Sequence, residues 1–195
     1  MDKHFYHAKS ALSKEICNTI IDSFNRVDDS KKALGPTNPY CKSRNIHFFQ
    51  YMKMSLDTNS ILHGPLIKHL KIYGTNNPFL TETTPWGVNP KCMIQKYLPG
   101  EHYGVEHCEQ NPTDSQIFRM LAWMFYLNDV QEGGGTAFPQ QNVELKARSG
   151  DLYIWPAFWT YSHYGIPAKS EIKYIVTGWC EYHNYLKKPQ SSDKN

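Results

Sequence analysis

The amino-acid sequence predicts a mainly β protein in which helices flank a jelly-roll core. After residue 90, short runs rich in β-branched and aromatic residues recur, with turn-forming residues between them. These runs cover residues 92–98, 120–127, 143–146, 150–155 and 172–179. Several short strands at this spacing favour two packed antiparallel sheets, which is the double-stranded β-helix or jelly roll.

Two amphipathic helices are expected ahead of these strands. Residues 13–24 begin at a suitable N-cap residue, Ser13, and a second helix is expected over residues 59–73. In both segments apolar residues recur at the spacing of one helical face. They are Ile16, Ile20, Ile21 and Phe24 in the first segment, and Leu62, Leu66, Ile67 and Leu70 in the second.

The remaining segments have the composition of loops. Residues 28–39 are rich in Asp, Ser, Lys, Gly, Pro and Asn, and prolines and glycines interrupt residues 74–90. The run Gly133–Gly135 predicts a turn with positive φ; a phosphate-binding loop would need a following helix with Lys-Ser or Lys-Thr. The tail over residues 187–195 is predicted to be solvated and disordered.

Length and composition predict one domain spanning residues 1–195. A chain with 40% hydrophobic and 14% aromatic residues can bury one substantial core. Residues 1–90 are expected to support a core over residues 91–183. The net charge of +3 is small and its charges are well mixed, so no nucleic-acid partner is indicated. The sequence does not indicate an oligomeric state.

Cysteine usage and hydropathy together predict a cytoplasmic protein. The five cysteines are irregularly spaced and include no Cys-x-x-Cys pair, which favours free thiols over disulfides or structural zinc. No apolar run approaches the length of a membrane span. The N-terminal residues also lack the apolar stretch of a signal peptide.

Two histidines and one glutamate form a candidate metal site. In an extended segment residues i and i+2 point to one face, so His107 and Glu109 can reach one ion while Cys108 faces away. A second histidine, His163, follows a predicted strand that a sheet can bring alongside. Two imidazoles and one carboxylate hold non-haem Fe(II) with open coordination positions. The His-x-Glu pair alone is weak evidence, because nine histidines and eighteen acidic residues produce such pairs by chance.

A lysine inside an apolar strand is the second candidate feature. Alternation over residues 172–180 places Lys173 on one face with Ile175, Thr177 and Trp179. Burial of a lone ammonium group is costly, so a carboxylate partner from the protein or from a ligand is expected. The alternative is that Lys173 lies on the solvated face of an edge strand.

Taken together, several motifs resemble the 2-oxoglutarate- and Fe(II)-dependent dioxygenases of the prolyl 4-hydroxylase type. The resemblance covers residues 92–183, about half of the chain. It rests on the order of the motifs, since each alone has low specificity. In chain order they are Tyr97, Gly100 and Tyr103, then His107 and Glu109, the run Tyr126-Leu-Asn-Asp129, the run Gly133 to Pro139, His163, Lys173, and Gly178-Trp179.

The resemblance implies a cofactor set and a role for individual residues. It implies Fe(II) ligated by His107, Glu109 and His163, with 2-oxoglutarate as co-substrate, O2 as oxidant and ascorbate as a candidate reductant. The distal carboxylate of 2-oxoglutarate would pair with Lys173. Further contacts to the co-substrate are implied for Tyr97, for Thr136 and Thr177 as weaker candidates, and for the aromatic ring of Trp179. Four other histidines, His47, His63, His69 and His102, are interpreted as surface or core residues.

The sequence departs from the family pattern at the acidic ligand. That branch ordinarily carries aspartate, whereas Glu109 is one methylene longer. Because other branches use His-x-Glu, the longer carboxylate is expected to reach the metal through a different rotamer.

The substrate stays open at the level of sequence. The resemblance implies hydroxylation of an aliphatic C–H bond, most readily of a prolyl residue in a peptide or protein, with release of succinate and CO2. The alternatives are hydroxylation of a free amino acid or small metabolite, and a non-catalytic jelly roll that only binds metal or ligand. Nucleic-acid demethylases are disfavoured, because they resemble a pattern with arginine where Lys173 stands. Candidate substrate contacts are residues 28–44, 74–90 and 110–116, Arg119, Arg148, Trp159 and Tyr161.

Overall fold

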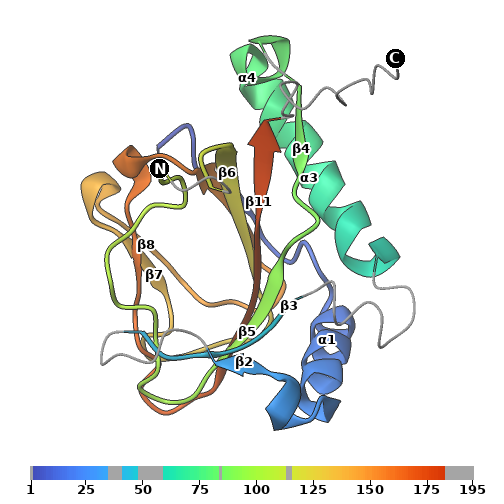
Figure 1. Ribbon diagram of the computed structural model, residues 1–195, viewed down its shortest axis with the longest axis vertical. Coiled ribbons are helices and arrows are strands. Elements are labelled where there is room, and N and C mark those ends of the chain that lie inside the picture. The colour runs from blue at the N-terminus through green and yellow to red at the C-terminus, as the bar shows by residue number, and fades with distance from the viewer. Residues whose placement is uncertain (1, 35–40, 48–58, 84, 113–115, 183–195) are drawn as a thin grey trace, which may run out of the picture.

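The computed structural model describes residues 2–34, 41–47, 59–83, 85–112 and 116–182. Two antiparallel sheets dominate it (Figure 1). The larger sheet has the order β1-β9-β6-β11-β5-β3-β2, and β4 also pairs with β11; the smaller has the order β10-β7-β8. The predicted mainly β fold is therefore confirmed.

The strand bounds agree with the predicted runs to within a few residues and add several short strands. In the larger sheet they are β1 (Tyr6–Ala8), β2 (Ala33–Leu34), β3 (Arg44–His47), β4 (Trp86–Val88), β5 (Met93–Tyr97), β6 (Arg119–Tyr126), β9 (Leu152–Pro156) and β11 (Lys173–Tyr182). In the smaller sheet they are β7 (Thr136–Phe138), β8 (Val143–Leu145) and β10 (Tyr164–Gly165).

Both predicted helices are present. Helix α1 (Lys14–Arg26) begins after Ser13, whose side chain accepts a hydrogen bond from the Ile16 amide. The second begins as a π-helical turn (Asn59–His63) and continues as α3 (Gly64–Asn76). Figure 1 shows α1 and α3 along one face of the larger sheet, with β7 and β8 on the other side.

The prediction of an irregular segment over residues 74–90 was wrong in part. It contains the end of α3, the short helix α4 (Pro78–Thr83) and the strand β4. Pro78 begins α4, where proline lacks only an amide that has no helical partner. In the predicted loop over residues 28–39, residues 29–31 form a 3₁₀ turn and β2 follows. The predicted tail over residues 187–195 lies outside the described residues.

The larger sheet is covered on both faces, and β6 shows this most clearly. Trp123 and Phe125 belong to a core cluster with the helices, whereas Met124 and Tyr126 belong to a second cluster that includes residues of the smaller sheet. Every residue of β6 after Arg119 is buried. The prediction of a strand buried between two layers is confirmed.

Strand β11 lies in the interior of the larger sheet. It pairs with β5 on one side and with β6 on the other. The edge-strand alternative for Lys173 is therefore wrong. Gly178 allows the close approach on the helix-facing side, since a Cβ at this position would collide with the Trp123 ring and the Cys92 side chain.

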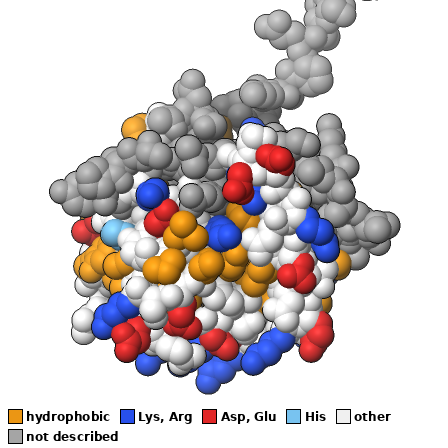
Figure 2. All heavy atoms as spheres, turned by 90° about the horizontal axis from the view of Figure 1, so that it is seen from below, with side chains coloured by type: hydrophobic (Ala, Val, Ile, Leu, Met, Phe, Trp, Pro, Cys, Tyr) orange, Lys and Arg blue, Asp and Glu red, His pale blue; other side chains and the backbone are white. Residues whose placement is uncertain are grey.

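Other predictions about turns and thiols also hold. Gly133 and Gly134 have φ values of 73° and 71°, as expected for a turn that requires glycine. All five cysteines are free. No helix in the described part of the chain has the length and apolar character needed to cross a membrane. On the face shown in Figure 2, acidic and basic side chains are interspersed around a band of hydrophobic ones.

Candidate metal and co-substrate site

The two candidate histidine ligands lie opposite each other on neighbouring backbone segments. The His107 amide donates to the His163 carbonyl at 3.0 Å, and the His163 amide donates to the His107 carbonyl at 2.8 Å. This isolated antiparallel bridge brings the two ring centroids to 4.5 Å. Residues that are fifty-six positions apart in the sequence thus meet by backbone pairing.

Each imidazole is oriented by a carbonyl two residues earlier in the chain. The Nδ1 atom of His107 lies 2.8 Å from the Val105 carbonyl oxygen, and Nδ1 of His163 lies 3.0 Å from that of Tyr161. A carbonyl oxygen can only accept, so Nδ1 carries the hydrogen in both rings. The lone pairs are therefore on Nε2, and the fixed tautomer suits metal ligation.

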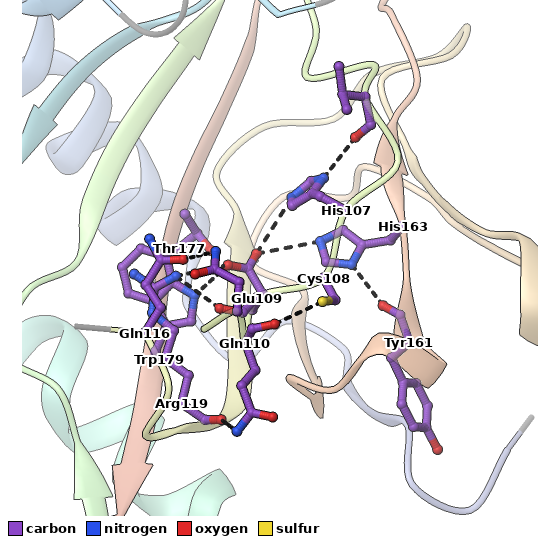
Figure 3. Close-up of polar contacts among 12 residues, drawn as sticks. His107, Cys108, Glu109, Gln110, Gln116, Arg119, Tyr161, His163, Thr177 and Trp179 are labelled. Carbon is purple, nitrogen blue, oxygen red and sulfur yellow. Dashed lines mark hydrogen bonds and ion pairs between the residues drawn. The ribbon is translucent and has the colours of Figure 1, made fainter. Parts of the chain in front are cut away.

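Both Nε2 atoms face one oxygen of Glu109 (Figure 3). Glu109 Oε1 lies 3.5 Å from Nε2 of His163 and 3.9 Å from Nε2 of His107. The ligand atoms of the three residues all lie within 4.8 Å of one another. The i and i+2 geometry predicted for His107 and Glu109 is thus observed, and the Cys108 thiol donates to the Gln110 carbonyl at 2.9 Å.

The protonation states of these groups suit a divalent cation. Burial would raise the pKa of Glu109, but the hydrogen bond and charge of His163, the charge of His107 and the Trp179 hydrogen bond lower it to about 2. Burial and the neighbouring His163 lower the pKa of His107, which favours its neutral form. One ionised carboxylate and imidazole nitrogens are a donor set that fits Fe(II).

Aromatic rings hold the two imidazoles in place. Phe138 stacks on His163 with ring centroids 4.9 Å apart, and Trp155 meets it edge-on at 5.3 Å. Tyr103 contacts His107 at 4.3 Å. From the N-terminal segment, Phe5 packs edge-on against Phe138 at 4.6 Å. The packing of Phe138 and Trp155 against His163 therefore restricts rotation of its ring.

A cavity of about 360 Å³ extends from the three ligands to Lys173. The Lys173 side chain is buried, and its ammonium group lies 4.6 Å from the centre of the Tyr97 ring. Burial lowers the pKa of Lys173 to about 8. Among the described residues no carboxylate pairs with this ammonium group. The partner that a buried lysine requires is thus left to a ligand.

The other predicted co-substrate residues line the same cavity, and the polar atom of each has its own hydrogen-bond partner in the protein. The Tyr97 hydroxyl donates to Gln95 Oε1 at 2.9 Å, and the Thr177 hydroxyl donates to the Trp123 carbonyl at 3.1 Å. The Thr136 and Tyr126 hydroxyls share a hydrogen bond of 2.8 Å. The Trp179 indole N–H donates to Glu109 Oε2 at 2.7 Å.

The residues predicted to contact substrate are only partly brought together. Arg119 lines the cavity, and so do Asn111 and Gln116 from residues 110–116. Arg148 is exposed and lies outside it, as do the described parts of residues 28–44 and 74–90. Trp159 is 71% exposed. Tyr161 is buried behind His163, with its hydroxyl donating to Asp2.

Of the remaining histidines, His63, His69 and His102 join no metal-binding group among the described residues. The His47 side chain lies outside the described part. Sequence reasoning assigned no role to Tyr103, Phe138 and Trp155 around the imidazoles. Tyr103 and Phe138 belong to motifs that carry the family resemblance. Their place in these motifs could have indicated a position near the metal ligands.

Comparison with known proteins yields a family match over the part of the chain that carries this site. Residues 92–181 match the model of the 2OG-Fe(II) oxygenase superfamily. A putative prolyl 4-hydroxylase from Acanthamoeba polyphaga mimivirus is 28% identical over 103 residues, which cover 45% of this chain and 43% of the viral protein. The chain thus spans less than half the length of that relative.

Two solved structures have the same fold. The viral collagen prolyl hydroxylase of Paramecium Bursaria Chlorella virus-1, solved with 2OG, superposes with a TM-score of 0.71 at 17% identity, covering 94% of this chain and 98% of that one. A Trichoplax adhaerens prolyl hydroxylase, in complex with a hypoxia inducible factor peptide fragment, has a TM-score of 0.63 at 16% identity, with 92% and 84% covered. At these identities the likeness establishes the fold.

Proposed function

We propose that the chain is a member of the 2OG-Fe(II) oxygenase superfamily, a dioxygenase that uses Fe(II) and 2-oxoglutarate to hydroxylate an aliphatic C–H bond. One observation carries the proposal. A single cavity has two imidazoles and an ionised carboxylate at one end, and a buried ammonium group without a protein carboxylate at the other. A dicarboxylic co-substrate can bind the metal with one end and the ammonium group with the other.

The protein contributes binding and orientation in this mechanism. His107, Glu109 and His163 would hold the metal, which with 2-oxoglutarate and O2 supplies the oxidant that converts C–H to C–OH, releasing succinate and CO2. Lys173 would fix the distal carboxylate of the co-substrate. No side chain needs to act as a general acid or base, because the metal and its co-substrates would supply the oxidant. The carbonyls of Val105 and Tyr161 orient the two imidazoles through their Nδ1 hydrogens.

The apolar part of the cavity wall favours this chemistry. Met93, Met124, Ile175 and Trp155 line it together with the polar residues. An apolar wall strengthens the pairing of Lys173 with a carboxylate and protects a reactive species from side reactions.

For the substrate we propose a prolyl residue in a peptide or protein. The support is the sequence likeness to the mimivirus putative prolyl 4-hydroxylase, together with a shared fold in a prolyl hydroxylase that was solved with a peptide. A free amino acid is the alternative, since jelly rolls retain their chemistry while their substrate loops change.

Uncoupled turnover tests the proposed activity. Protein reconstituted anaerobically with Fe(II) and 2-oxoglutarate is exposed to O2, and succinate is measured with and without proline-containing peptides. We expect metal-dependent succinate that rises with a suitable peptide, and none from His163→Ala.

Two outcomes separate the alternatives. Succinate stimulated by free proline and by no peptide would favour a small-molecule hydroxylase. Binding of Fe(II) and 2-oxoglutarate without any succinate, with peptide or without it, would favour the non-catalytic jelly roll.

A further inference from the structure

The two oxygens of the Glu109 carboxylate have different environments. Oε1 faces the Nε2 atoms of both histidines, whereas Oε2 accepts the Trp179 indole hydrogen at 2.7 Å. Arg119 Nη1 approaches Oε2 at 3.5 Å and donates to the Glu109 backbone carbonyl at 3.1 Å. Figure 3 shows these contacts converging on Glu109 from the side away from the histidines.

The donors that hold Oε2 are themselves rigid. The Arg119 guanidinium carbon lies 3.6 Å from the centre of the Trp179 ring, so the two side chains stack. Trp179 is buried, and it follows Gly178, whose close packing on Trp123 leaves the strand little freedom to shift. This packing favours a fixed position of the indole N–H behind the carboxylate.

We infer that Trp179 and Arg119 are positioning residues that make Glu109 a one-oxygen metal ligand. A glutamate has one more rotatable bond than aspartate, and its free carboxylate can offer either one oxygen or both to a cation. With Oε2 held by the indole, only Oε1 is presented to the metal. The extra methylene is thereby matched to the distance between the indole and the imidazoles, and one-oxygen ligation by Glu109 would leave the metal free to bind co-substrate. This inference rests on the proposed function.

The test is a double-mutant cycle read out by metal binding. Trp179→Phe removes the indole N–H and keeps a ring for Arg119, whereas Glu109→Asp shortens the carboxylate so that it cannot reach both the indole and the metal. Affinity is measured by titration with Co(II), and the visible absorption of bound Co(II) reports its coordination number.

We expect Trp179→Phe to weaken Co(II) binding about tenfold and to lower the visible absorption intensity, as a second carboxylate oxygen joins the metal. In the Glu109→Asp background the same change should alter affinity by less than about twofold, because no indole bond remains to be lost. If Trp179 contributed only packing, Trp179→Phe would lower Co(II) affinity equally in the wild-type protein and in Glu109→Asp. That result would overturn the inference.

Trp86→Phe is the matched control. Trp86 lies on β4 and packs against the helix-facing core cluster, on the opposite side of the sheet from the cavity that Trp179 lines. We expect unchanged Co(II) affinity for this variant; a loss equal to that of Trp179→Phe would overturn the inference. If Trp179→Phe gives no cooperative thermal transition, Arg119→Met replaces it in the cycle, with a smaller loss confined to the Glu109 background.

Failure of the inference is distinguishable from failure of the proposed function. Wild-type protein that binds no divalent metal would contradict the proposed function. Wild-type protein that binds Co(II) with the same affinity and spectrum as Trp179→Phe would contradict only the role of the indole.

Discussion

The two ends of the central cavity differ in how the protein surrounds a buried charged group. At the metal end, the Glu109 carboxylate has imidazole, indole and guanidinium neighbours from the protein itself. At the other end, the Lys173 ammonium group lies over the Tyr97 ring, and none of the carboxylates in the described part of the chain pairs with it. The pKa of Glu109 is accordingly lowered to about 2 and that of Lys173 to about 8, so one end favours charge and the other opposes it.

The metal end is therefore complete in the folded protein, whereas the lysine end is completed only when a ligand binds. The metal end is assembled by backbone pairing and hydrogen bonds that exist in the folded protein. The lysine end carries a free-energy cost that a bound carboxylate would relieve. Substitutions at the two ends should therefore separate metal binding, co-substrate binding and stability.

The largest effect is expected at the metal end. His163→Ala removes one of three ligands from a site that has no fourth among the described residues. We expect metal affinity to fall by more than about 100-fold, a larger loss than substitutions behind a ligand cause. Anaerobic competition titration against a chelator measures it. A loss below tenfold would mean that His163 is not a ligand.

At the lysine end, Lys173→Met should separate binding from stability. We expect 2-oxoglutarate affinity to fall by about 30-fold or more, corresponding to about 2 kcal/mol, while metal affinity stays within about twofold. Because Lys173→Met no longer buries an unpaired ammonium group, the free energy of unfolding of the apoprotein should rise by about 1–3 kcal/mol. Calorimetric titration and thermal melts measure the two effects. A destabilised apoprotein would contradict the unfavourable burial of Lys173.

The pH dependence of stability should also show the free-energy cost of burying the Lys173 ammonium group. With a pKa of about 8 when folded and an ordinary value of 10.5, Lys173 binds fewer protons in the folded state than in the unfolded state between these limits. Its destabilising contribution is therefore full below pH 8 and fades as pH rises toward 10.5. Urea melts of wild-type apoprotein and Lys173→Met should converge over this window. A difference that is constant with pH would contradict the lowered pKa.

The smallest effects are expected for the two threonines. Since the Thr177 hydroxyl already donates to the Trp123 carbonyl, it has no hydrogen left for a carboxylate, and Thr177→Val should change 2-oxoglutarate affinity by less than about threefold. The Thr136 hydroxyl can donate to a ligand while Tyr126 donates to it. Thr136→Val is therefore expected to lower 2-oxoglutarate affinity by about 5- to 10-fold. The reverse order in calorimetric titration would show that Thr177 is the co-substrate contact.

The sequence predicted the features that depend on local periodicity. The i and i+2 relation of His107 and Glu109 and the alternation that buries Lys173 follow from strand geometry, and both are observed. The five main strands and both long helices follow from runs of apolar residues in the same way. His163 was paired with the other ligands only through the order of motifs, because its backbone bridge to His107 is a tertiary contact.

The features that were missed depend on contacts between distant segments. Phe5, in the N-terminal segment, packs on a ring that touches His163, and no local pattern relates residue 5 to residue 163. The contacts of Trp179 and Arg119 with Glu109 likewise join residues from β11, β6 and the loop before it. Helix α4 was missed because Pro78 was interpreted as a break, although proline also begins helices.

The most direct test of the two-ended cavity is anaerobic calorimetric titration of 2-oxoglutarate into wild-type protein, with and without Fe(II), and into Lys173→Met with Fe(II). We predict one equivalent bound to the Fe(II)-loaded wild type, and binding weakened by at least about 30-fold when either the metal or the lysine is removed. Equal affinity in all three titrations would contradict the claim that 2-oxoglutarate spans the cavity from the metal to Lys173.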